Sequence, residues 1–357
     1  MLDVFESNNA TEWNNLVATS RYASAYHLWE WGETLSQTYG YKKHYFVSKL
    51  DNEIAGVFPL IHVQSMLFGN RLISLPFCEY GGIVLRLGLK PEEANQAVKS
   101  LTDVTNEFAR SIGAEYIEVR EPLVLRNAFH VSGYTEFQVY TTFRIDLTRG
   151  TKQLRSGLRQ NTRRAVRKAV KSGLVVENAK ESEQLKAYYD LYLQTQKRLG
   201  SPPHCYKLFE NLFDAFSPSG KMRILLAKHQ GKPIAGIIVF SYEKTIIYWN
   251  NVTDAKYRRL NPTNLLLWNT IEWGAENGYH VMDMGRTRKD TTIYYFKSGW
   301  DGQETPLHDY VRFQGSRRGQ LPDPSQRKFR YLSNVWSFLP IAVAKKIGPK
   351  VISGIAL

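Results

Sequence analysis

The sequence repeats one order of elements in its two halves, and this repeat constrains the fold more than any other feature. Residues 44–63 (HYFVSKLDNEIAGVFPLIHV) predict two strands joined at the turn pair Asp51-Asn52, because β-branched and aromatic residues flank that pair. Residues 223–242 (RILLAKHQGKPIAGIIVFSY) have the same form, with the turn at Gln230-Gly231. Both hairpins carry Ile-Ala-Gly at the same place, which predicts two copies of one structural unit.

A helix and a strand are expected after each hairpin. Pro91 and Pro262 suit the first turn of a helix, where the missing N–H costs nothing. Apolar residues then recur at steps of three and four, and the helices are expected to stop at Gly113 and Gly278. The strands EYIEVR and HVMDMG follow. The repeat predicts an α/β (α+β) fold of two tandem units with mixed central sheets, and chance likeness between two ordinary α/β domains is the alternative.

The repeat also sets the expected domain boundaries. We expect a first domain at residues 1–146, a second at residues 147–315, and a basic and apolar tail at residues 316–357. A chain of 357 residues is long enough for two cores. The tail sequence VWSFLPIAVAKKIGPKVISGIAL is too short and too interrupted to span a bilayer. Its apolar residues and lysines predict either a membrane-surface contact or a helix packed on the domain.

The second domain is expected to open with a strongly basic helical segment. Seven Lys or Arg residues lie between Arg155 and Lys171, and no acid occurs at residues 147–176. A merely solvated helix face usually mixes charges of both signs, so this segment favours an anionic partner. Gly157 leaves two forms open, one helix or two shorter ones. No helix-turn-helix, zinc-finger or basic-zipper pattern is present, so RNA or a phosphorylated small molecule is expected and DNA is not.

The overall charge and the cysteines bear on partners and compartment. Lys plus Arg number 47 against 33 for Asp plus Glu, which favours anionic partners. Cys78 and Cys205 are too few to form a disulfide framework or a zinc site. The start, MLDVFESNNATEW, has acids where a signal peptide needs positive charge. We therefore expect a cytoplasmic protein, peripheral at the inner face of the membrane if the tail binds there.

The densest run of reactive side chains is YHVMDMGRTRKDTTIYYFKSGW, residues 279–300. The strand that carries Asp283 is expected to end here and to release a loop and a short helix, and active sites of α/β proteins commonly lie at such strand exits. Lys297, flanked by Phe296 and Trp300, is the cation best placed to stabilise the oxyanion of an acyl transfer. Asp283 is a candidate proton acceptor by residue type alone, and a satisfied strand residue is the alternative.

Other catalytic patterns are absent from the sequence. There is no G-x-S-x-G elbow, no Walker loop, no G-x-G-x-x-G and no H-E-x-x-H. The eight histidines lack the spacing of metal ligands, so we expect neither a metal nor a cofactor. A reaction whose nucleophile is the amine of the substrate itself needs no covalent catalyst.

Three stretches together resemble the Fem family of aminoacyltransferases. LRQNTRRAVRKAVKSGLVV resembles the arginine-rich stretch before that family's second domain. The order GKPIAGIIVFSYEKTIIYWNN, YRRLNPTNLLLWNTIEWGAENGYHVMDMGR and IYYFKSGW resembles the second domain itself. The opening YHLWEWGETLSQTYGYKKHYFV with IAGVFPLIH is similar to the first domain. The likeness extends to about Tyr310, as a spaced pattern rather than one sharp motif.

This resemblance implies two tandem GNAT-like domains and a defined chemistry. The family moves an amino acid from aminoacyl-tRNA to an amine of a peptidoglycan precursor, and Phe296-Lys297 matches a Phe-Lys pair in its active site. The implied partners are aminoacyl-tRNA and a phosphorylated or lipid-linked cell-envelope precursor. The candidate catalytic residues are Lys297 and Asp283. The candidate substrate-binding residues are Phe296, Arg286, Tyr294, Trp249, Tyr257, Tyr80, Arg163, Arg164 and Arg167.

Two departures keep other functions open. The family's long coiled-coil insertion has no room between Val176 and Arg223. The glycine-rich loop of CoA-dependent GNAT enzymes is replaced by LGLKPEEAN and RRLNPTNLL, where Pro262 removes a backbone donor. A CoA-dependent N-acyltransferase for a nucleotide sugar or polysaccharide precursor is therefore the second hypothesis. A non-enzymatic RNA- or membrane-binding protein on a degenerate transferase fold is the third.

Overall fold

The computed structural model of the chain describes residues 3–20, 22–121, 126–315 and 327–356. The chain divides into two compact units. Unit 1 comprises residues 1–140, 306–323 and 353–357, and unit 2 comprises residues 141–305 and 324–352. The division differs from the sequential one that the repeat predicts at residues 146 and 315. The reason is that residues 308–313, near the end of the expected second domain, pair with a strand of unit 1.

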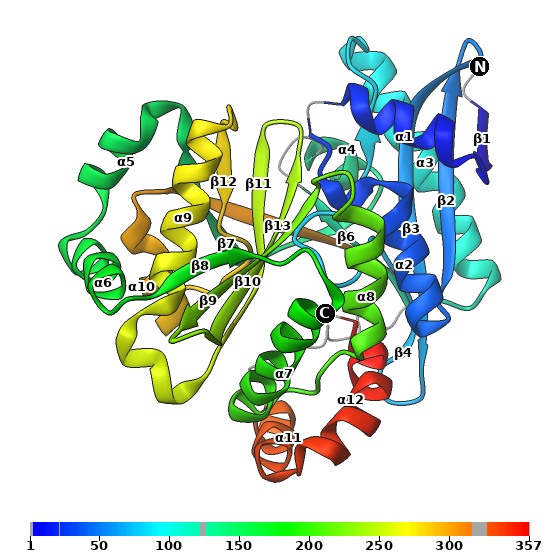
Figure 1. Cartoon of the computed structure of the whole chain (residues 1–357). Coiled ribbons are helices and arrows are strands. Elements are labelled where there is room, and N and C mark those ends of the chain that lie inside the picture. The colour runs from blue at the N-terminus through cyan, green and yellow to red at the C-terminus, as the bar shows by residue number, and fades with distance from the viewer. Residues whose placement is uncertain (1–2, 21, 122–125, 316–326, 357) are drawn as a thin grey trace. The chain divides into compact units, whose positions relative to one another are not determined.

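Unit 1 contains a mixed sheet in the order β1-β2-β3-β4-β6-β13 (Figure 1). Its pairs are antiparallel except for β4 with β6, which run parallel. The short β5 pairs with β3. The strands are β1 (Asp3–Glu6), β2 (Lys42–Leu50), β3 (Glu53–Ser65), β4 (Gly69–Ile73), β5 (Val84–Leu85), β6 (Tyr116–Glu121) and β13 (Gln303–Phe313).

The helices of unit 1 include the long one predicted after the first hairpin. They are α1 (Ala10–Thr19), α2 (Trp29–Tyr39), α3 (Pro91–Ser111) and α4 (Arg126–Val131). Pro91 stands at the start of α3 as predicted, and Gly113 follows its end with φ 65°. The apolar face of α3, with Val98, Leu101 and Ala109, is fully buried against the sheet.

Unit 2 repeats the mixed arrangement, in the order β7-β12-β11-β10-β9-β8 (Figure 1). Here the parallel pair is β11 with β12. The strands are β7 (Thr135–Asp146, of which residues 141–146 belong to this unit), β8 (Val175–Asn178), β9 (Met222–His229), β10 (Lys232–Tyr242), β11 (Thr245–Thr253) and β12 (Val281–Asp283). Two tandem units with mixed sheets confirm the predicted fold class.

Helices cover both faces of the sheet of unit 2. Ala235, Ile237 and Val239 of β10 enter the core formed with α9, whereas Gly236 and Phe240 face α7 and α8. The helices are α5 (Gly150–Gly157), α6 (Gln160–Lys171), α7 (Ser182–Leu199), α8 (Tyr206–Phe216), α9 (Pro262–Glu276), α10 (Thr292–Lys297), α11 (Arg327–Phe338) and α12 (Ile341–Ile355). A Cβ at Gly236 would lie 2.6 Å from the ring of Tyr188, so this close approach of α7 requires glycine.

The two hairpins match in the conformation of their turns. Asp51 and Asn52 have φ of 51° and 66°, and Gln230 and Gly231 have φ of 51° and 77°, so both turns use the left-handed conformations that tight hairpins need. The strand register shifts at Ile-Ala-Gly in both hairpins but one residue apart: Ala55 has no partner in the first, and Ile234 has none in the second. The turn residues and the Ile-Ala-Gly positions therefore confirm the predicted repeat of the hairpin.

The described part of the tail packs on the protein. In unit 2, Ser333 on α11 donates to the carbonyl oxygen of Leu199, and Trp336 and Ala344 are buried. In unit 1, the buried guanidinium of Arg71 donates to the carbonyl oxygens of Gly354 and Ile355. Residues 316–326 of the expected tail lie outside the described residues. Among the described residues, no helix is long and apolar enough to cross a membrane.

Candidate functional site

The strand exit that the sequence singles out lies in unit 2. β12 ends at Asp283, Gly285 turns the chain with φ 72°, and a loop leads to α10. The hydroxyl of Thr291 caps α10 by accepting a hydrogen bond from the N–H of Tyr294 at 3.1 Å. The cap fixes the start of a helix of only six residues, and Lys297 is its last residue.

Lys297 is a buried lysine with defined partners. Its side chain is 5% exposed, and its Nζ donates to the carbonyl oxygen of Gly285 at 2.9 Å and to that of Arg286 at 3.0 Å. The Nζ also lies 6.0 Å from the ring centroid of Tyr248. A buried ammonium group is costly unless such dipoles solvate it, so this geometry keeps a positive charge at the strand exit.

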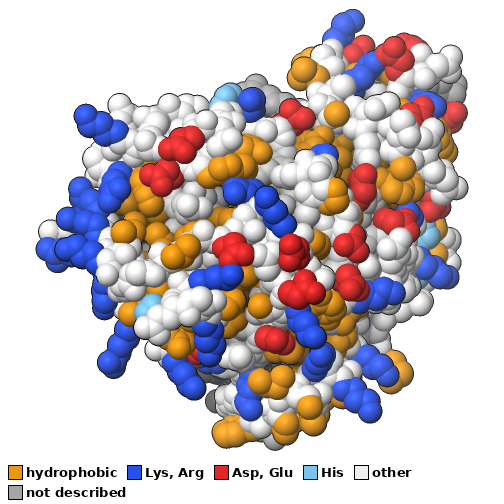
Figure 2. Space-filling model, in the orientation of Figure 1, with side chains coloured by type: hydrophobic (Ala, Val, Ile, Leu, Met, Phe, Trp, Pro, Cys, Tyr) orange, Lys and Arg blue, Asp and Glu red, His pale blue; other side chains and the backbone are white. Residues whose placement is uncertain are grey.

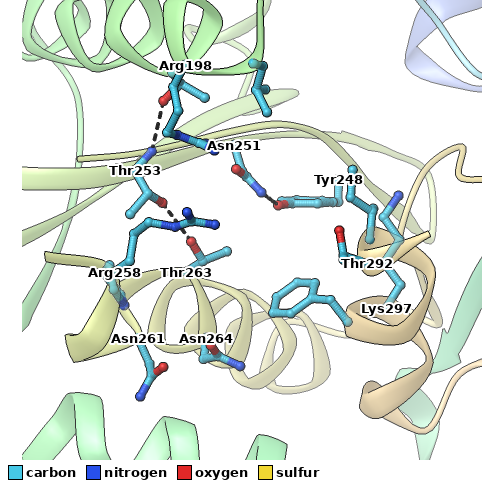
Figure 3. A pocket seen from close by; sticks show the side chains of 15 residues that line it. Arg198, Tyr248, Asn251, Thr253, Arg258, Asn261, Thr263, Asn264, Thr292 and Lys297 are labelled. Atoms are coloured by element: carbon cyan, nitrogen blue, oxygen red, sulfur yellow. Dashed lines mark hydrogen bonds between the residues drawn. The ribbon is translucent and has the colours of Figure 1, made fainter. Parts of the chain in front are cut away.

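A pocket of about 410 Å³ opens beside Lys297 (Figure 3). The pocket lies wholly in unit 2, and its walls come from α7, β11, the turn before α9 with the first turn of α9, and α10. The lining residues are Thr195, Arg198, Leu199, Tyr248, Asn251, Thr253, Arg258, Asn261, Pro262, Thr263, Asn264, Thr292, Ile293, Phe296 and Lys297. No acid is among them, so the pocket suits a ligand that is anionic or becomes anionic.

Hydrogen bonds order the polar wall of this pocket. Asn251 donates through its side-chain amide to the hydroxyl of Tyr248. The hydroxyls of Thr253 and Thr263 are 2.9 Å apart, and the N–H of Thr253 donates to Thr195. Figure 3 shows these contacts as dashed lines across β11 and the start of α9. Burial raises the pKa of Tyr248 above its ordinary value, so its phenol stays protonated.

A β-bulge shapes the same wall. The register between β10 and β11 shifts between Ile238 and Val239, and Trp249 is the residue of β11 that has no partner across the strands. The ring of Trp249 packs at 5.6 Å from that of Phe240 and at 6.1 Å from that of Phe209. Trp249 is therefore a packing residue, whereas its neighbours Tyr248 and Asn251 line the pocket.

Asp283, the candidate proton acceptor, lies outside the pocket lining. Its carboxylate is 1% exposed, accepts from the hydroxyl of Thr142 at 2.6 Å and from the N–H of Gly285 at 2.9 Å, and does not line the pocket. Through Gly285, whose carbonyl oxygen accepts from Lys297, Asp283 supports the position of the lysine. The two hydrogen bonds tie the buried carboxylate to Thr142 and to the turn at Gly285.

The other candidate residues of the second half divide between the pocket and its surroundings. Phe296 lines the pocket, whereas Arg286 does not line it and accepts a hydrogen bond from Lys297 through its backbone carbonyl oxygen. The hydroxyl of Tyr294 donates to Glu304 at 2.7 Å. Tyr257 packs against a small cluster around Leu265. Tyr294 and Tyr257 do not line the pocket. They contact Glu304 and the cluster around Leu265, respectively.

Tyr80 is a residue of unit 1, and its carbonyl oxygen accepts a hydrogen bond from Cys78 at 2.8 Å. The pocket beside Lys297 consists of residues of unit 2, so Tyr80 is not one of its lining residues.

The pocket also contains polar residues that the sequence did not single out as ligands. They are Thr195, Arg198, Tyr248, Asn251, Thr253, Arg258, Asn261, Thr263, Asn264 and Thr292. The sequence could have pointed to the residues around Pro262, because RRLNPTNLL occupies the place of the CoA-binding loop. Nothing in the sequence pointed to Arg198, since it lies in the last turn of a helix that only the tertiary fold brings to the pocket.

The basic segment forms two helices, α5 and α6, with the break after Gly157. A Cβ at Gly157 would lie 2.0 Å from the carboxylate of Asp301, so a larger residue there would displace that side chain. Figure 2 shows Lys and Arg side chains gathered over these helices, at the left of the view. We call this set the basic surface. Its exposed members are Lys152, Arg155, Arg159, Arg164, Arg167, Lys168 and Lys171.

Arg163 departs from the other arginines of the segment. Its side chain is half-buried, and its guanidinium donates to the carbonyl oxygen of Leu158 at 3.4 Å. Arg164 and Arg167 are exposed as predicted for a contact surface.

Comparison with known proteins identifies the fold. Residues 156–301 match the family model for an acetyltransferase (GNAT) domain, and all 15 pocket-lining residues fall in this segment. The crystal structure of FemX superposes with a TM-score of 0.70 at 15% identity, covering 87% of this chain and 97% of FemX. No curated protein sequence matches the chain.

Two further structures extend the likeness. L-PGS from Bacillus licheniformis gives a TM-score of 0.56 at 12% identity and covers 97% of this chain and 98% of its own. A tandem GNAT protein from the clavulanic acid biosynthesis pathway gives 0.58 at 12% identity, covering 89% of this chain and 100% of its own. At such identities the likeness defines the fold, which is a tandem, Fem-like GNAT fold.

Proposed function

We propose that this chain, which has a Fem-like GNAT fold, is an acyltransferase that moves an aminoacyl group from aminoacyl-tRNA to an amine of a cell-envelope precursor. One observation supports this proposal above the others. Lys297, whose ammonium is buried and held by two carbonyl oxygens, lies in the wall of a pocket without acids. A fixed cation of this kind stabilises an oxyanion, which is the charge that develops in acyl transfer.

The proposed reaction needs no covalent intermediate with the protein. The acceptor amine attacks the carbonyl carbon of the aminoacyl ester, and the new C–N bond forms as the carbonyl oxygen takes the negative charge. Lys297 stabilises that oxygen. The bond between the carbonyl carbon and the ribose oxygen then breaks. The proton of the amine passes to the departing ribose oxygen through the neighbouring ribose hydroxyl, so Asp283 is not needed as a base.

The basic surface supports an RNA donor. Its seven exposed cations lie on α5, on α6 and at Arg159 between them, and the segment from residue 147 to residue 176 contains no acid. Cations spaced along two helices suit the phosphates of a nucleic-acid backbone and carry no pattern for reading bases. In this proposal the basic surface holds the tRNA body, and the pocket holds its aminoacylated end.

The exposed surface of α11 and α12 supports contact with a lipid-linked acceptor. Val335, Phe338, Val343 and Ile347 are exposed on α11 and α12, and Phe338 is 85% exposed. Lys345, Lys346 and Lys350 on α12 are also exposed, and residues 324–357 contain no acid. We propose that this face lies on an anionic membrane surface. Phe338→Glu should reduce cosedimentation with vesicles containing phosphatidylglycerol, and unchanged cosedimentation would contradict the contact.

A CoA-dependent N-acyltransferase is the second candidate. The match of residues 156–301 to an acetyltransferase model favours it. The missing glycine-rich loop weighs against it, because Pro262 begins α9 and lacks a backbone donor. Saturable binding of acetyl-CoA together with acyl transfer to a nucleotide sugar would favour this candidate over the first.

The first test follows label from donor to acceptor. The purified protein is incubated with a pool of labelled aminoacyl-tRNAs and a fraction of cell-envelope precursors, and in parallel with labelled acyl-CoAs. Transfer from aminoacyl-tRNA to an amine supports the proposal, and transfer from acyl-CoA alone supports the second candidate. If neither donor yields transfer while tRNA still binds, the third hypothesis, a non-enzymatic binding protein, replaces both.

A further inference from the structure

The pocket has a second positively charged end, which the chemistry at Lys297 does not use. Arg198 reaches it from the end of α7, and Arg258 reaches it from η3 (Ala255–Leu260), the short 3₁₀ helix before α9. Figure 3 shows both arginines on the side of Thr253 and Thr263, and Lys297 on the opposite side, near Thr292.

Arg198 and Arg258 are both solvent-exposed where they line the pocket. Among the residues that the structure describes, neither guanidinium has a carboxylate within ion-pair distance, and no acid lines the pocket. By contrast, Arg149 pairs with Asp301 at 2.8 Å. Partial burial and repulsion from Arg258 lower the pKa of Arg198 from its ordinary value. Two exposed cations that line one pocket without an acid attract an anionic ligand.

We propose that Arg198 and Arg258 form a subsite for a phosphate group of a nucleotide-linked acyl donor. A guanidinium presents a fork of N–H donors that matches phosphate oxygens. The hydroxyls of Thr253 and Thr263 and the amides of Asn261 and Asn264 offer further donors in the same wall. With Pro262 at the first position of α9, side chains replace the backbone cradle that a glycine-rich loop would supply.

This subsite rests on the proposed function and makes it more specific. A donor whose phosphate lies between the arginines has its acyl carbonyl directed toward Lys297 at the other end of the pocket. The subsite would then distinguish nucleotide-linked donors from free amino acids or simple esters. Two donors carry suitable phosphates: the 3′-terminal phosphodiesters of a tRNA and the pyrophosphate of an acyl-CoA.

The test measures binding directly, without transfer. The full-length protein is titrated into a fluorescent CCA trinucleotide RNA, which is too short to span the basic surface, and unlabelled CoA is used as a competitor. The double variant Arg198→Ala/Arg258→Ala should lose at least tenfold in affinity and show a weaker salt dependence, because phosphate contacts release counterions. Arg198→Lys/Arg258→Lys should retain part of the affinity. Arg259→Ala removes an exposed neighbouring charge that does not line the pocket, and should stay within twofold of the wild type.

The possible outcomes distinguish failure of the subsite from failure of the proposed acyltransferase function. Displacement by CoA at micromolar concentration identifies CoA as a donor, and trinucleotide binding that CoA does not displace identifies tRNA. A double variant within twofold of the wild type for both ligands, or a wild type that binds neither, overturns the subsite. If the double variant loses binding but the wild type transfers no acyl group, the subsite stands and the proposed function fails. If the double variant transfers as fast as the wild type at limiting donor, the proposed function stands and the subsite fails.

Discussion

The Nζ of Lys297 lies 2.9 Å from the carbonyl oxygen of Gly285, whose own N–H donates to the carboxylate of Asp283 at 2.9 Å. A buried acid and a buried ammonium are thus linked through one backbone residue at the end of β12. The acid holds the turn, and the turn holds the cation against the pocket.

Replacing Lys297 should remove the proposed catalytic charge. We expect Lys297→Ala to lower kcat about a hundredfold or more, or about 3 kcal/mol of transition-state stabilisation, while circular dichroism and the thermal midpoint show a folded protein. Lys297→Met, which keeps most of the buried volume, should lose as much activity. Lys289→Met is the matched control, because Lys289 is exposed and pairs with Glu304 at 3.2 Å. A near-normal turnover in both Lys297 variants would rule out its assigned role.

Replacing Asp283 should affect the position of Lys297 more than the chemistry. Asp283→Asn keeps an oxygen that accepts from Thr142 and Gly285, so we expect at most a tenfold loss of kcat and a pH–rate profile of unchanged shape. Asp283→Ala leaves two buried donors unsatisfied and should lower the free energy of unfolding by roughly 1–3 kcal/mol for each. If Asp283→Asn lost as much activity as Lys297→Ala and its profile lost one titration, Asp283 would be the general base after all.

The sequence was sufficient for features that depend on local pattern. The hairpins at Asp51-Asn52 and Gln230-Gly231 follow from turn residues that adopt positive φ, and both occur where the sequence predicts them. The break after Gly157, one of the two forms that the sequence left open, is also local. Phe296 and Lys297 were predicted as neighbours in a loop-to-helix segment, and both line the pocket.

Features that depend on tertiary packing could not be predicted from the sequence. Asp283 accepts from Thr142, 141 positions away in the chain, and no periodicity reveals that pairing. Trp249 was selected by residue type, but a shift in the strand register turns it into the packing around Phe240. Arg198 and Arg258 line one pocket because the tertiary fold brings the end of α7 and the turn before α9 together there. Sequence patterns therefore singled out Phe296 and Lys297, which line the pocket, but not Arg198 and Arg258.

Neutralising the basic surface should weaken tRNA binding without altering the pocket. We expect the triple variant Arg164→Ala/Arg167→Ala/Lys168→Ala to bind tRNA at least tenfold more weakly, because each lost phosphate contact removes favourable counterion release. The slope of log affinity against log salt should fall by about 2 to 3. The measurement is a filter-binding titration at several salt concentrations. Lys90→Ala/Lys99→Ala/Arg110→Ala removes three exposed charges from unit 1 and is the matched control. Equal losses in both triples would point to net charge rather than to the basic surface.

Buried His27 should make unit 1 sensitive to acid. Its Nδ1 accepts from the N–H of Ser24 at 3.1 Å, so the ring is neutral, and burial lowers its pKa from 6.5 to about 4. Because the folded pKa lies below the unfolded one, the neutral ring contributes stability that is fully present above pH 6.5. This contribution is lost as the pH falls through about 4, and it amounts to about 3 kcal/mol.

The measurement is the urea midpoint of wild type and His27→Gln between pH 7 and pH 4. The wild type should lose stability over this range, and His27→Gln should start lower at pH 7 and show a shallower decline, since an amide does not titrate there. His280→Gln is the control, because His280 is exposed and should leave the wild-type decline unchanged. Parallel declines in wild type and His27→Gln would assign the acid sensitivity to other groups, with His204, whose pKa burial lowers to about 3, as the next to test.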